Sequence, residues 1–403
     1  MGLDKDFKKY VASTFPECIV NEASSPDGVV VDCMVILHQF KPRTTESEEG
    51  LMETEDEPAK RLVNNIWWTI NDASHAALCF DVTETTPVAK EIEWGKRPKA
   101  EVAVTPESVA KMLLFHELPH YDSIVSSRAA RHILCEYVVQ EIFKRLRSSD
   151  TTKTVLVLDD GVPRYAERVA LEVVVTERPE LSRTLHGEAD VSGIFAAHVL
   201  RGEHGCASVQ MRTSDTDWAF ISVLNPFPGM SIKLTHFDYH ARTPVHLVID
   251  ATKLNKAVST KYGVSAHEWA TLVATRGTDY CEKMLKGVPD WTKYMDTCSN
   301  ELLRVKRKRG VTDVATSSFV DTDAIHETLV AASKMPRANL AYDKRDGALA
   351  RLAFHVLYSS NAPLNGGAGL DCLSFGGWSR PAQSGVVKRA AHSGGVFSMP
   401  KTG

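Results

Sequence analysis

The chain has 403 residues, of which 43% are hydrophobic and 24% charged, a composition typical of ordinary soluble proteins and sufficient for one large domain or two modest ones. Its net charge of −4 at pH 7 excludes a globally basic nucleic-acid-binding protein, although a local basic face is compatible with an acidic total. We expect no membrane span, secretory signal or myristoylation site, because no apolar run is long enough and the first residues fit neither motif.

Alternating apolar segments predict an α/β fold with a mainly parallel central sheet flanked by helices. The predicted strands cover residues 29–37, 153–158, 209–224 and 245–250. The predicted helices cover residues 126–149, 163–174, 187–200 and 265–277, the first of them capped by Ser126 or Ser127. The eight scattered cysteines contain no Cys-x-x-Cys pair, which argues against a zinc site or a disulfide framework and predicts a reducing compartment, nuclear or cytoplasmic.

Carboxylates stand beside the ends of the predicted strands, or in the first turn of a helix, at five places: Asp32, the pair Asp159 and Asp160, Glu188 with Asp190, Asp215 with Asp217, and Asp279. Because the carboxyl ends of parallel strands form one edge of a sheet, these side chains can converge there. Asp215 and Asp217 are two residues apart on a predicted strand, so we expect them to face the same side. Taken singly, each carboxylate is better explained as a helix cap or a turn residue.

A cluster of carboxylates without Cys or His is a set of hard oxygen donors, which suits Mg²⁺ or Mn²⁺. Two such ions about 4 Å apart support phosphodiester cleavage. The order of the motifs resembles that of the flap endonuclease and 5′-nuclease superfamily, XPG-type nucleases with a PIN-like fold. The segments that carry the resemblance are "MGLDKDF", "VVVDCMVILHQF", "LVLDDGVP", "GEADVSGIFAAHV", "TSDTDWAF" and "GTDYCEKMLKGV".

The resemblance implies a metal site with two Mg²⁺ or Mn²⁺ ions. One ion would be held by Asp160, Glu188, Asp190 and Asp215, and the second by Asp217 and Asp279, with Asp32 acting through water and Asp215 between the ions. The family also places basic residues on the helix after its Asp-Gly-x-Pro turn. Arg164 and Arg168 share one face of the predicted helix there, although an exposed helix face paired with Glu167 explains them equally well. Nucleic-acid contacts are expected from Gly2, Lys283, Lys286 and Gly287.

The chain departs from the family in three intervals. The interval between Gly161 and Glu188 is too short for a long helical arch, whereas residues 41–125 are predicted to be an insertion that offers a surface for a protein partner. Pro289 replaces a backbone donor in the segment expected to begin a helical hairpin after the Gly-x-Asp-Tyr motif. The predicted organisation is a nuclease core over 1–300, a helical extension over 301–360 and a flexible Gly/Ser-rich tail over 361–403.

The resemblance implies a divalent-metal-dependent, structure-specific nuclease of the 5′-flap or 5′-exonuclease type that hydrolyses phosphodiester bonds of DNA. Two alternatives stay open. One is an RNA-directed nuclease of the same fold, of the host-shutoff or exoribonuclease type. The other is a non-catalytic nuclease-fold module in a larger assembly such as a virion. Nucleic acid is the expected partner, no sliding-clamp peptide is present, and a viral source is among those that fit.

Overall fold

The computed structural model describes residues 5–21, 25–40, 58–81, 105, 107–109, 121–159, 161–182, 189–238, 243–277, 283–288, 290–310, 321–334 and 338–340. The chain divides into two compact units. We call residues 24–86 and 95–212 the sheet unit, and residues 1–23, 87–94 and 213–403 the helical unit. In these described ranges, no helix has the length and apolar character needed to cross a membrane.

The sheet unit is built on six strands in the order β5-β4-β3-β2-β1-β6. Their bounds are β1 (Gly28–Asp32), β2 (His75–Cys79), β3 (Thr154–Leu158), β4 (Arg164–Val169), β5 (Glu172–Glu177) and β6 (Val209–Thr213). β1 pairs in parallel with both β2 and β6, and β2 pairs in parallel with β3, whereas β4 and β5 are antiparallel. The predicted mainly parallel sheet is therefore confirmed.

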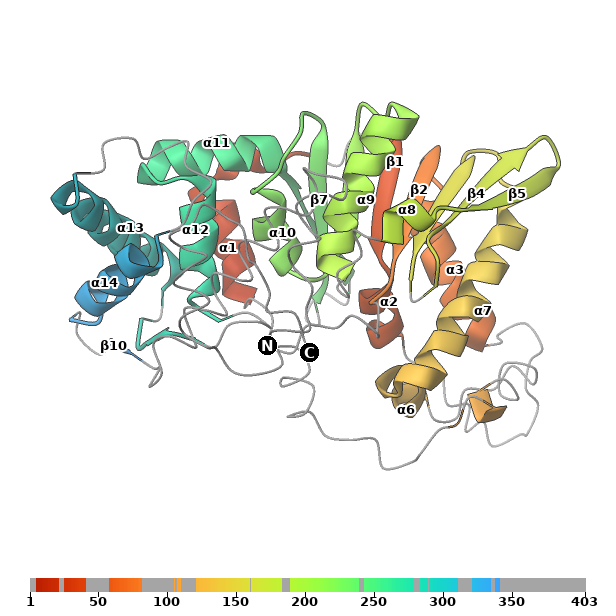
Figure 1. Cartoon of the computed structure of the whole chain (residues 1–403), viewed down its shortest axis with the longest axis horizontal. Coiled ribbons are helices and arrows are strands. Elements are labelled where there is room, and N and C mark those ends of the chain that lie inside the picture. Colours follow the sequence, from red (N-terminus) through yellow and green to blue (C-terminus); the bar gives the residue numbers. More distant parts are fainter. Residues whose placement is uncertain are drawn as a thin grey trace, which may run out of the picture. The chain divides into compact units, whose positions relative to one another are not determined.

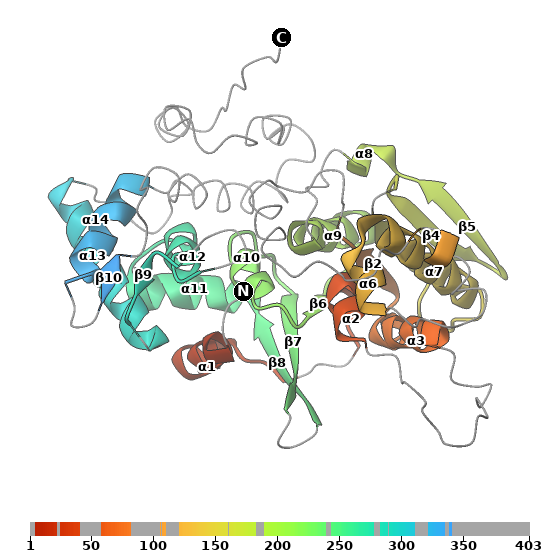
Figure 2. The same ribbon diagram turned by 90° about the horizontal axis from the view of Figure 1, so that it is seen from below.

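Helices cover both faces of this sheet. They are α2 (Cys33–Gln39), α3 (Pro58–Ile70), α6 (Tyr121–Ser126), α7 (Arg128–Leu146), α8 (Pro179–Ser182) and α9 (Ala189–His204). α9 packs against β1 and β2, and α3 and α7 lie on the opposite face (Figures 1 and 2). Every residue of β1 and β3 is buried, as expected for parallel strands covered on both sides. Ser127 caps α7 by accepting from the Ala130 N–H, which confirms the predicted start of that helix.

The predicted helix over residues 163–174 is wrong, because this segment forms β4 and the beginning of β5. A two-residue turn, Ala170-Leu171, joins the strands, and Ala170 has a φ of 55°. The residues that follow the turn are mostly β-branched, which favours a strand. Arg164 and Arg168 therefore lie on one face of a strand, since they are an even number of residues apart.

Two predicted strands are shorter than expected. β1 ends at Asp32, whose side chain accepts from the Val35 N–H and caps α2. β6 ends at Thr213, and the apolar run that follows forms the short helix α10 (Asp217–Ser222). Asp215 and Asp217 therefore do not share a strand face, which corrects the sequence-based expectation. A short apolar run fits a strand or a buried helix equally well, and here the chain leaves the sheet.

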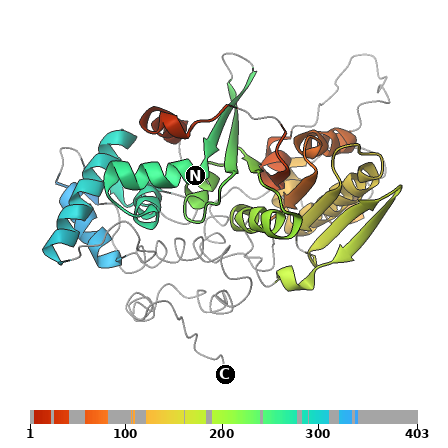
Figure 3. The same cartoon turned by 90° about the horizontal axis from the view of Figure 1, so that it is seen from above.

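The helical unit begins with α1 (Lys5–Thr14) and the 3₁₀ helix η1 (Pro16–Cys18) and resumes with α10. It continues with β7 (Met230–Asp238), β8 (Thr243–Asp250), α11 (Ala251–Tyr262), α12 (Ala266–Ala274), β9 (Leu285–Lys286), α13 (Trp291–Lys308), α14 (Thr322–Ala332) and β10 (Asn339–Leu340). β7 and β8 form an antiparallel hairpin, and β9 pairs antiparallel with β10, which follows it in the chain only after α13 and α14. α13 and α14 follow the Gly-x-Asp-Tyr segment and lie side by side (Figure 3, teal and blue).

Aromatic packing holds α1 in the helical unit. The ring of Tyr10 stacks on Trp291 with centroids 5.7 Å apart, and Phe7 meets the same indole edge-on at 5.2 Å. The Tyr10 hydroxyl lies 2.9 Å from the Tyr262 hydroxyl, which satisfies both polar groups inside the core. The first helix of the chain is thus tied to α11 and α13 by buried contacts.

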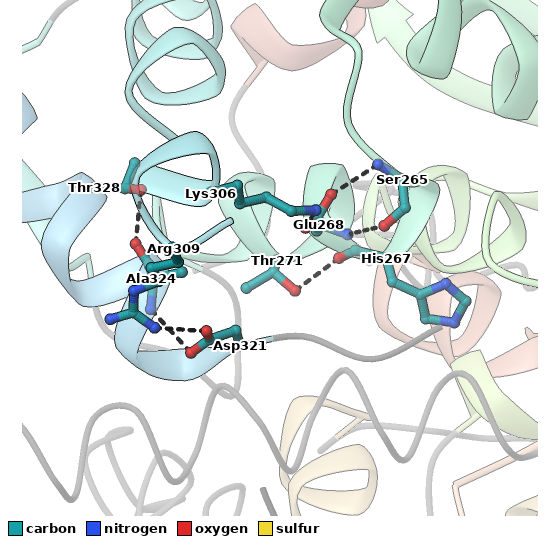
Figure 4. A network of polar contacts seen from close by, with 9 residues as sticks. All are labelled: Ser265, His267, Glu268, Thr271, Lys306, Arg309, Asp321, Ala324 and Thr328. Atoms are coloured by element: carbon teal, nitrogen blue, oxygen red, sulfur yellow. Dashed lines mark hydrogen bonds and ion pairs between the residues drawn. The ribbon is translucent and has the colours of Figure 1, made fainter. Parts of the chain in front are cut away.

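Polar contacts connect α12, α13 and α14 (Figure 4). Ser265 and Glu268 form a reciprocal capping box at the start of α12. The Lys306 ammonium of α13 lies 2.5 Å from the Glu268 carboxylate, and Arg309 pairs with Asp321 at 2.6 Å. Cations in the basic run at the end of α13 are therefore paired with acids of the neighbouring helices.

The segment predicted as an insertion, residues 41–125, contributes to the sheet itself. It contains α3 and β2, and β2 lies between β1 and β3. This part is therefore integral to the sheet unit. The predicted boundary at residue 300 falls within α13, and the predicted tail over 361–403 lies outside the described residues. The role of residues 41–125 in binding a protein partner stays a prediction.

Candidate functional site

The carboxyl ends of β1, β2 and β3 bring three aspartates to one edge of the sheet unit. Asp32 is the last residue of β1 and is in register with Cys79, the last residue of β2. Cys79 is in register with Leu158, so Asp81 follows the end of β2 and Asp159 the end of β3. Ligands of parallel α/β sheets bind outside this edge, which makes these side chains the first candidates for a site.

Asp32 is buried, with 2% of its surface exposed, and its orientation is fixed by the cap that it forms on α2. Its charge affects the pKa values of two neighbouring thiols. Burial raises the pKa of Cys79 well above its usual value, and the charge of Asp32 raises it further. The pKa of Cys33 is also raised well above its usual value, first by burial and then by the charges of Cys79 and Asp32. A raised thiol pKa disfavours the thiolate form that binds metal ions, which favours the oxygen donors at this edge.

Asp81 is the candidate site residue that the sequence analysis missed. Its Oδ1 accepts a hydrogen bond of 3.1 Å from the backbone N–H of Ala189, the first residue of α9. This contact places the end of β2 beside the helix start at which Glu188 and Asp190 stand in the sequence. The signal was present as an apolar run ending in Asp ("AALCFD"), like the run that ends in Asp32. Because residues 41–125 were assigned to an insertion, Asp81 was not predicted to stand at the end of a strand of the sheet.

Asp159 is engaged by its own turn and by Arg164. Its Oδ1 accepts from the Gly161 N–H at 2.9 Å, and its Oδ2 pairs with the Arg164 guanidinium. Arg164 also pairs with Glu136 of α7 at 2.9 Å. Burial alone would lower the pKa of Arg164, but the two carboxylates outweigh it and the pKa is raised. Arg164 thus forms ion pairs within this unit, and the phosphate-binding role predicted for Arg164 and Arg168 stays a prediction.

In the helical unit, Asp215 and Asp217 lie in the turn after β6 and at the start of α10. The Asp217 N–H donates to Oδ1 of Asp215 at 2.9 Å, and the Asp215 N–H donates to Oγ1 of Thr213 at 2.9 Å. Asp217 is 1% exposed. Lys8 of α1 lies near enough for Asp215 to affect it: burial lowers the pKa of Lys8, and the charge of Asp215 partly offsets that effect. The Asp215 carboxylate is therefore held by a backbone N–H, and the cation of Lys8 is near it.

Of the seven predicted metal ligands, Asp160, Glu188 and Asp279 lie outside the described residues, as does the side chain of Asp190 in α9. Within the described part of the chain, no group of three or more His, Cys, Asp or Glu side chains is placed to hold a metal ion. The described members of the set, Asp32, Asp215 and Asp217, together with Asp81, offer oxygen atoms only. This donor chemistry fits Mg²⁺ or Mn²⁺, and the full ligand set stays a prediction.

The predicted nucleic-acid contacts lie partly within the described residues. Lys283 and Lys286 are exposed, and Gly287 is exposed with a φ of 84°. Arg276 holds this segment by donating to the Val288 carbonyl at 3.1 Å and by lying 4.3 Å from the centre of the Trp291 ring. Gly2 lies outside the described residues. The two lysines are therefore presented to solvent beside an anchored turn, and their contact with phosphates stays a prediction.

No protein-family model matches the chain, and no curated protein matches it either. Among solved structures, it is similar to the bacteriophage T5 flap endonuclease co-crystallized with metal ions, at 13% identity over 83% of this chain and 90% of that chain, with a TM-score of 0.36. The catalytic core of Rad2 in complex with a DNA substrate is 14% identical over 73% of this chain and 68% of that chain, with a TM-score of 0.35.

Human GEN1 in complex with Holliday junction DNA is 12% identical over 83% of this chain and 70% of that chain, also with a TM-score of 0.35. Nucleases of the kind that the sequence motifs resemble thus reappear among solved structures. At these identities and TM-scores, the likeness assigns no residue role and no activity to this chain.

Proposed function

We propose that the chain is a divalent-metal-dependent, structure-specific nuclease that hydrolyses phosphodiester bonds of DNA. The hydrogen bond between Asp81 and the Ala189 N–H is the observation that carries this proposal. It brings the carboxylate after β2 to the start of α9, where the sequence places Glu188 and Asp190. Asp32 stands at the end of the adjacent strand, so the sheet unit gathers hard oxygen donors at the edge where α/β folds bind ligands.

When bound at such carboxylates, two Mg²⁺ or Mn²⁺ ions activate a water molecule and stabilise the leaving oxygen of a phosphodiester. The residues of this chain would hold the ions and fix the direction of each donor. Asp32 is oriented by its cap on α2, Asp81 by the Ala189 N–H and Asp215 by the Asp217 N–H. Donors held by backbone groups lose little freedom when an ion binds.

Lys283 and Lys286 are proposed to contact the phosphates of the substrate beyond the scissile bond, because both are exposed beside the turn at Gly287. Such contacts would contribute affinity that falls as the salt concentration rises. DNA is proposed as the substrate on the strength of the sequence motifs. RNA is the alternative that the cleavage experiment must distinguish.

The test is cleavage of 5′-flap DNA, nicked duplex DNA and structured RNA by the purified chain, with Mn²⁺, with Mg²⁺ and with a chelator. The matched variants are Asp217→Asn, at a buried candidate ligand, and Asp150→Asn, at an exposed position after α7. We expect metal-dependent cleavage that Asp217→Asn abolishes and Asp150→Asn retains. Cleavage by Asp217→Asn at the wild-type rate would contradict the proposal. A folded chain that cuts nothing and binds no metal would instead support a non-catalytic module.

A further inference from the structure

The β4–β5 hairpin lies at one end of the strand order of the sheet unit, and β5 is the last strand at this end. In the part of the chain that the structure describes, β5 pairs with β4 alone, and it stands at the end of the strand order (Figure 1). Five of its six residues are exposed, and the sixth is half-buried. An edge strand of this kind is a template on which another strand can pair.

The ladder of the hairpin shows which backbone groups face outward. The Arg178 N–H donates to the Pro163 carbonyl at 2.7 Å, so residue 178 points toward the β4 side. The Arg168 N–H donates to the Lys153 carbonyl, so the backbone of residue 168 points toward the β3 side and away from β5. Arg168 is paired in register with Val173 of β5. Because the direction alternates along an antiparallel strand, the N–H and C=O groups of Val173, Val175 and Glu177 point away from β4.

The same hairpin concentrates exposed apolar side chains. Of the eight large apolar side chains that are exposed in the described residues, four lie here: Val169, Leu171, Val174 and Val175. Leu171, in the turn, is 85% exposed. β5 carries no Pro or Lys, and its ladder with β4 has no bulge. Its two charged residues, Glu172 and Glu177, stand at the ends of the strand, so no charge, proline or bulge interrupts residues 173–176 between them.

We propose that β5 is a dimerisation strand that pairs antiparallel with β5 of a second copy of this chain. Outward-facing residues must meet one another, which gives a two-fold register with Val175 opposite Val175 of the partner subunit. Val173 then lies opposite Glu177 of the partner subunit, and Glu172 lies opposite Arg178 of the partner subunit. No carboxylate faces a carboxylate in this register, and opposite charges meet at both ends of the pair.

We expect the dimer to be weak, because its interface is small. One pair of short strands buries less surface than the roughly 1,200 Å² of a stable interface, so we expect association in the micromolar range. The dimer does not depend on the nuclease activity proposed above, because β5 contains none of the candidate metal ligands. A continuous sheet across two copies would present two sheet units in a two-fold arrangement.

The experiment is sedimentation velocity of the full chain over roughly a hundredfold range of micromolar concentrations. The test variant is Val175→Pro, which removes an outward N–H and is tolerated in an edge strand. The control is Val175→Thr, which keeps the N–H and the strand propensity. We expect a reversible dimer for the wild type and for Val175→Thr, and a dissociation constant at least about tenfold higher for Val175→Pro.

A second variant guards against loss of folding in Val175→Pro. Glu172→Lys keeps every backbone donor and places a lysine opposite Arg178 of the partner subunit, so it should also weaken the dimer without changing the melting temperature. A wild-type chain that stays monomeric over the whole range would overturn the proposal. So would a dimer whose dissociation constant is unchanged in both Val175→Pro and Glu172→Lys, because that dimer would use another surface.

Discussion

The backbone N–H of Ala189 donates to Oδ1 of Asp81 at 3.1 Å, which fastens the start of α9 to the end of β2. A helix start favours a nearby negative charge, so this contact both anchors the helix and fixes the carboxylate. Asp81 thus stabilises the fold and, in our proposal, is also part of the metal site. Its two roles can be separated by substitution.

Asp81→Asn should keep the contact with Ala189, because an amide oxygen also accepts a hydrogen bond, but it removes the charge that a metal ion requires. We expect cleavage to fall by about 10- to 100-fold while the melting temperature changes little. Asp81→Ala should lower both. Cleavage rates and thermal unfolding of the two variants provide the measurement, and an Asn variant as active as the wild type would remove Asp81 from the site.

Mn²⁺ should raise the melting temperature of the chain, since an ion that binds only the folded state stabilises it. At a concentration about 100 times the dissociation constant, the gain is roughly 2.7 kcal/mol. Asp217→Asn should lose most of this increase, and Asp150→Asn should retain it. Differential scanning fluorimetry with and without Mn²⁺ measures the effect without any substrate. An equal increase in both variants would place the bound ion elsewhere.

The sequence predicted the parallel sheet, but it did not predict its antiparallel end. β1 and β3 are unbroken apolar runs, and Ser127 is a clear helix cap, so these elements were readable. The β4–β5 hairpin was not, because its turn, Ala170-Leu171, lacks the Gly or Asn that marks a tight turn. Arg164 and Arg168 also have a spacing that fits one face of a helix as well as one face of a strand.

The candidate site was predicted in part. The residue types and their order along the chain are visible in the sequence, and Asp32 does stand at the end of a strand. The contact of Asp81 with α9 was not accessible, because it joins residues 108 positions apart. Strand register alone shows that the ends of β1, β2 and β3 are level with one another. The positions of Asp160, Glu188 and Asp279 stay predictions.

Lys306→Met should destabilise the helical unit strongly. Lys306 and Glu268 are 9% and 6% exposed at the side chain, and removal of the ammonium leaves a buried carboxylate without its cation. The cost of breaking such a pair is about 3 to 5 kcal/mol. Urea unfolding provides the measurement, with Lys308→Met as the matched control at an exposed position of the same helix. A change below about 1 kcal/mol would show that water replaces the lost partner.

The free energy of unfolding should decrease as the pH falls below about 6.5, because of two histidines. His75 and His204 stack with their rings 4.9 Å apart. Burial lowers the pKa of both below the ordinary value of 6.5, and for His75 the charge of His204 adds to the effect. The unfolded chain therefore takes up protons first as the pH falls, so stability is fully present above this value and is lost toward the lower folded-state pKa values.

His204→Gln should reduce this pH dependence, because it removes one of the two titrating groups and the positive charge that opposes protonation of His75. Urea unfolding at about pH 7.5 and about pH 5.5 measures the difference in unfolding free energy. His132→Gln, at an exposed position of α7, is the control. If His204→Gln loses as much stability on acidification as the wild type, other groups determine the slope.

Arg164→Met should lower the free energy of unfolding by about 2 to 3 kcal/mol, because Asp159, which is buried, would lose its cation. Arg168→Met should change it by less than about 1 kcal/mol. Chemical unfolding of both variants tests whether Arg164 acts in the fold. Unchanged stability of Arg164→Met together with lost cleavage would return it to the catalytic role that its sequence position suggested.

The buried thiols make the chain its own reporter of local opening. Cys33, Cys79, Cys135 and Cys206 are buried in the sheet unit, and Cys18 and Cys298 are buried in the helical unit. A cysteine-reactive reagent modifies such a thiol only when the surrounding structure opens. Labelling followed by peptide mapping would therefore give a separate opening rate for each unit of the unmodified protein, and would show whether bound metal or substrate slows one unit or both.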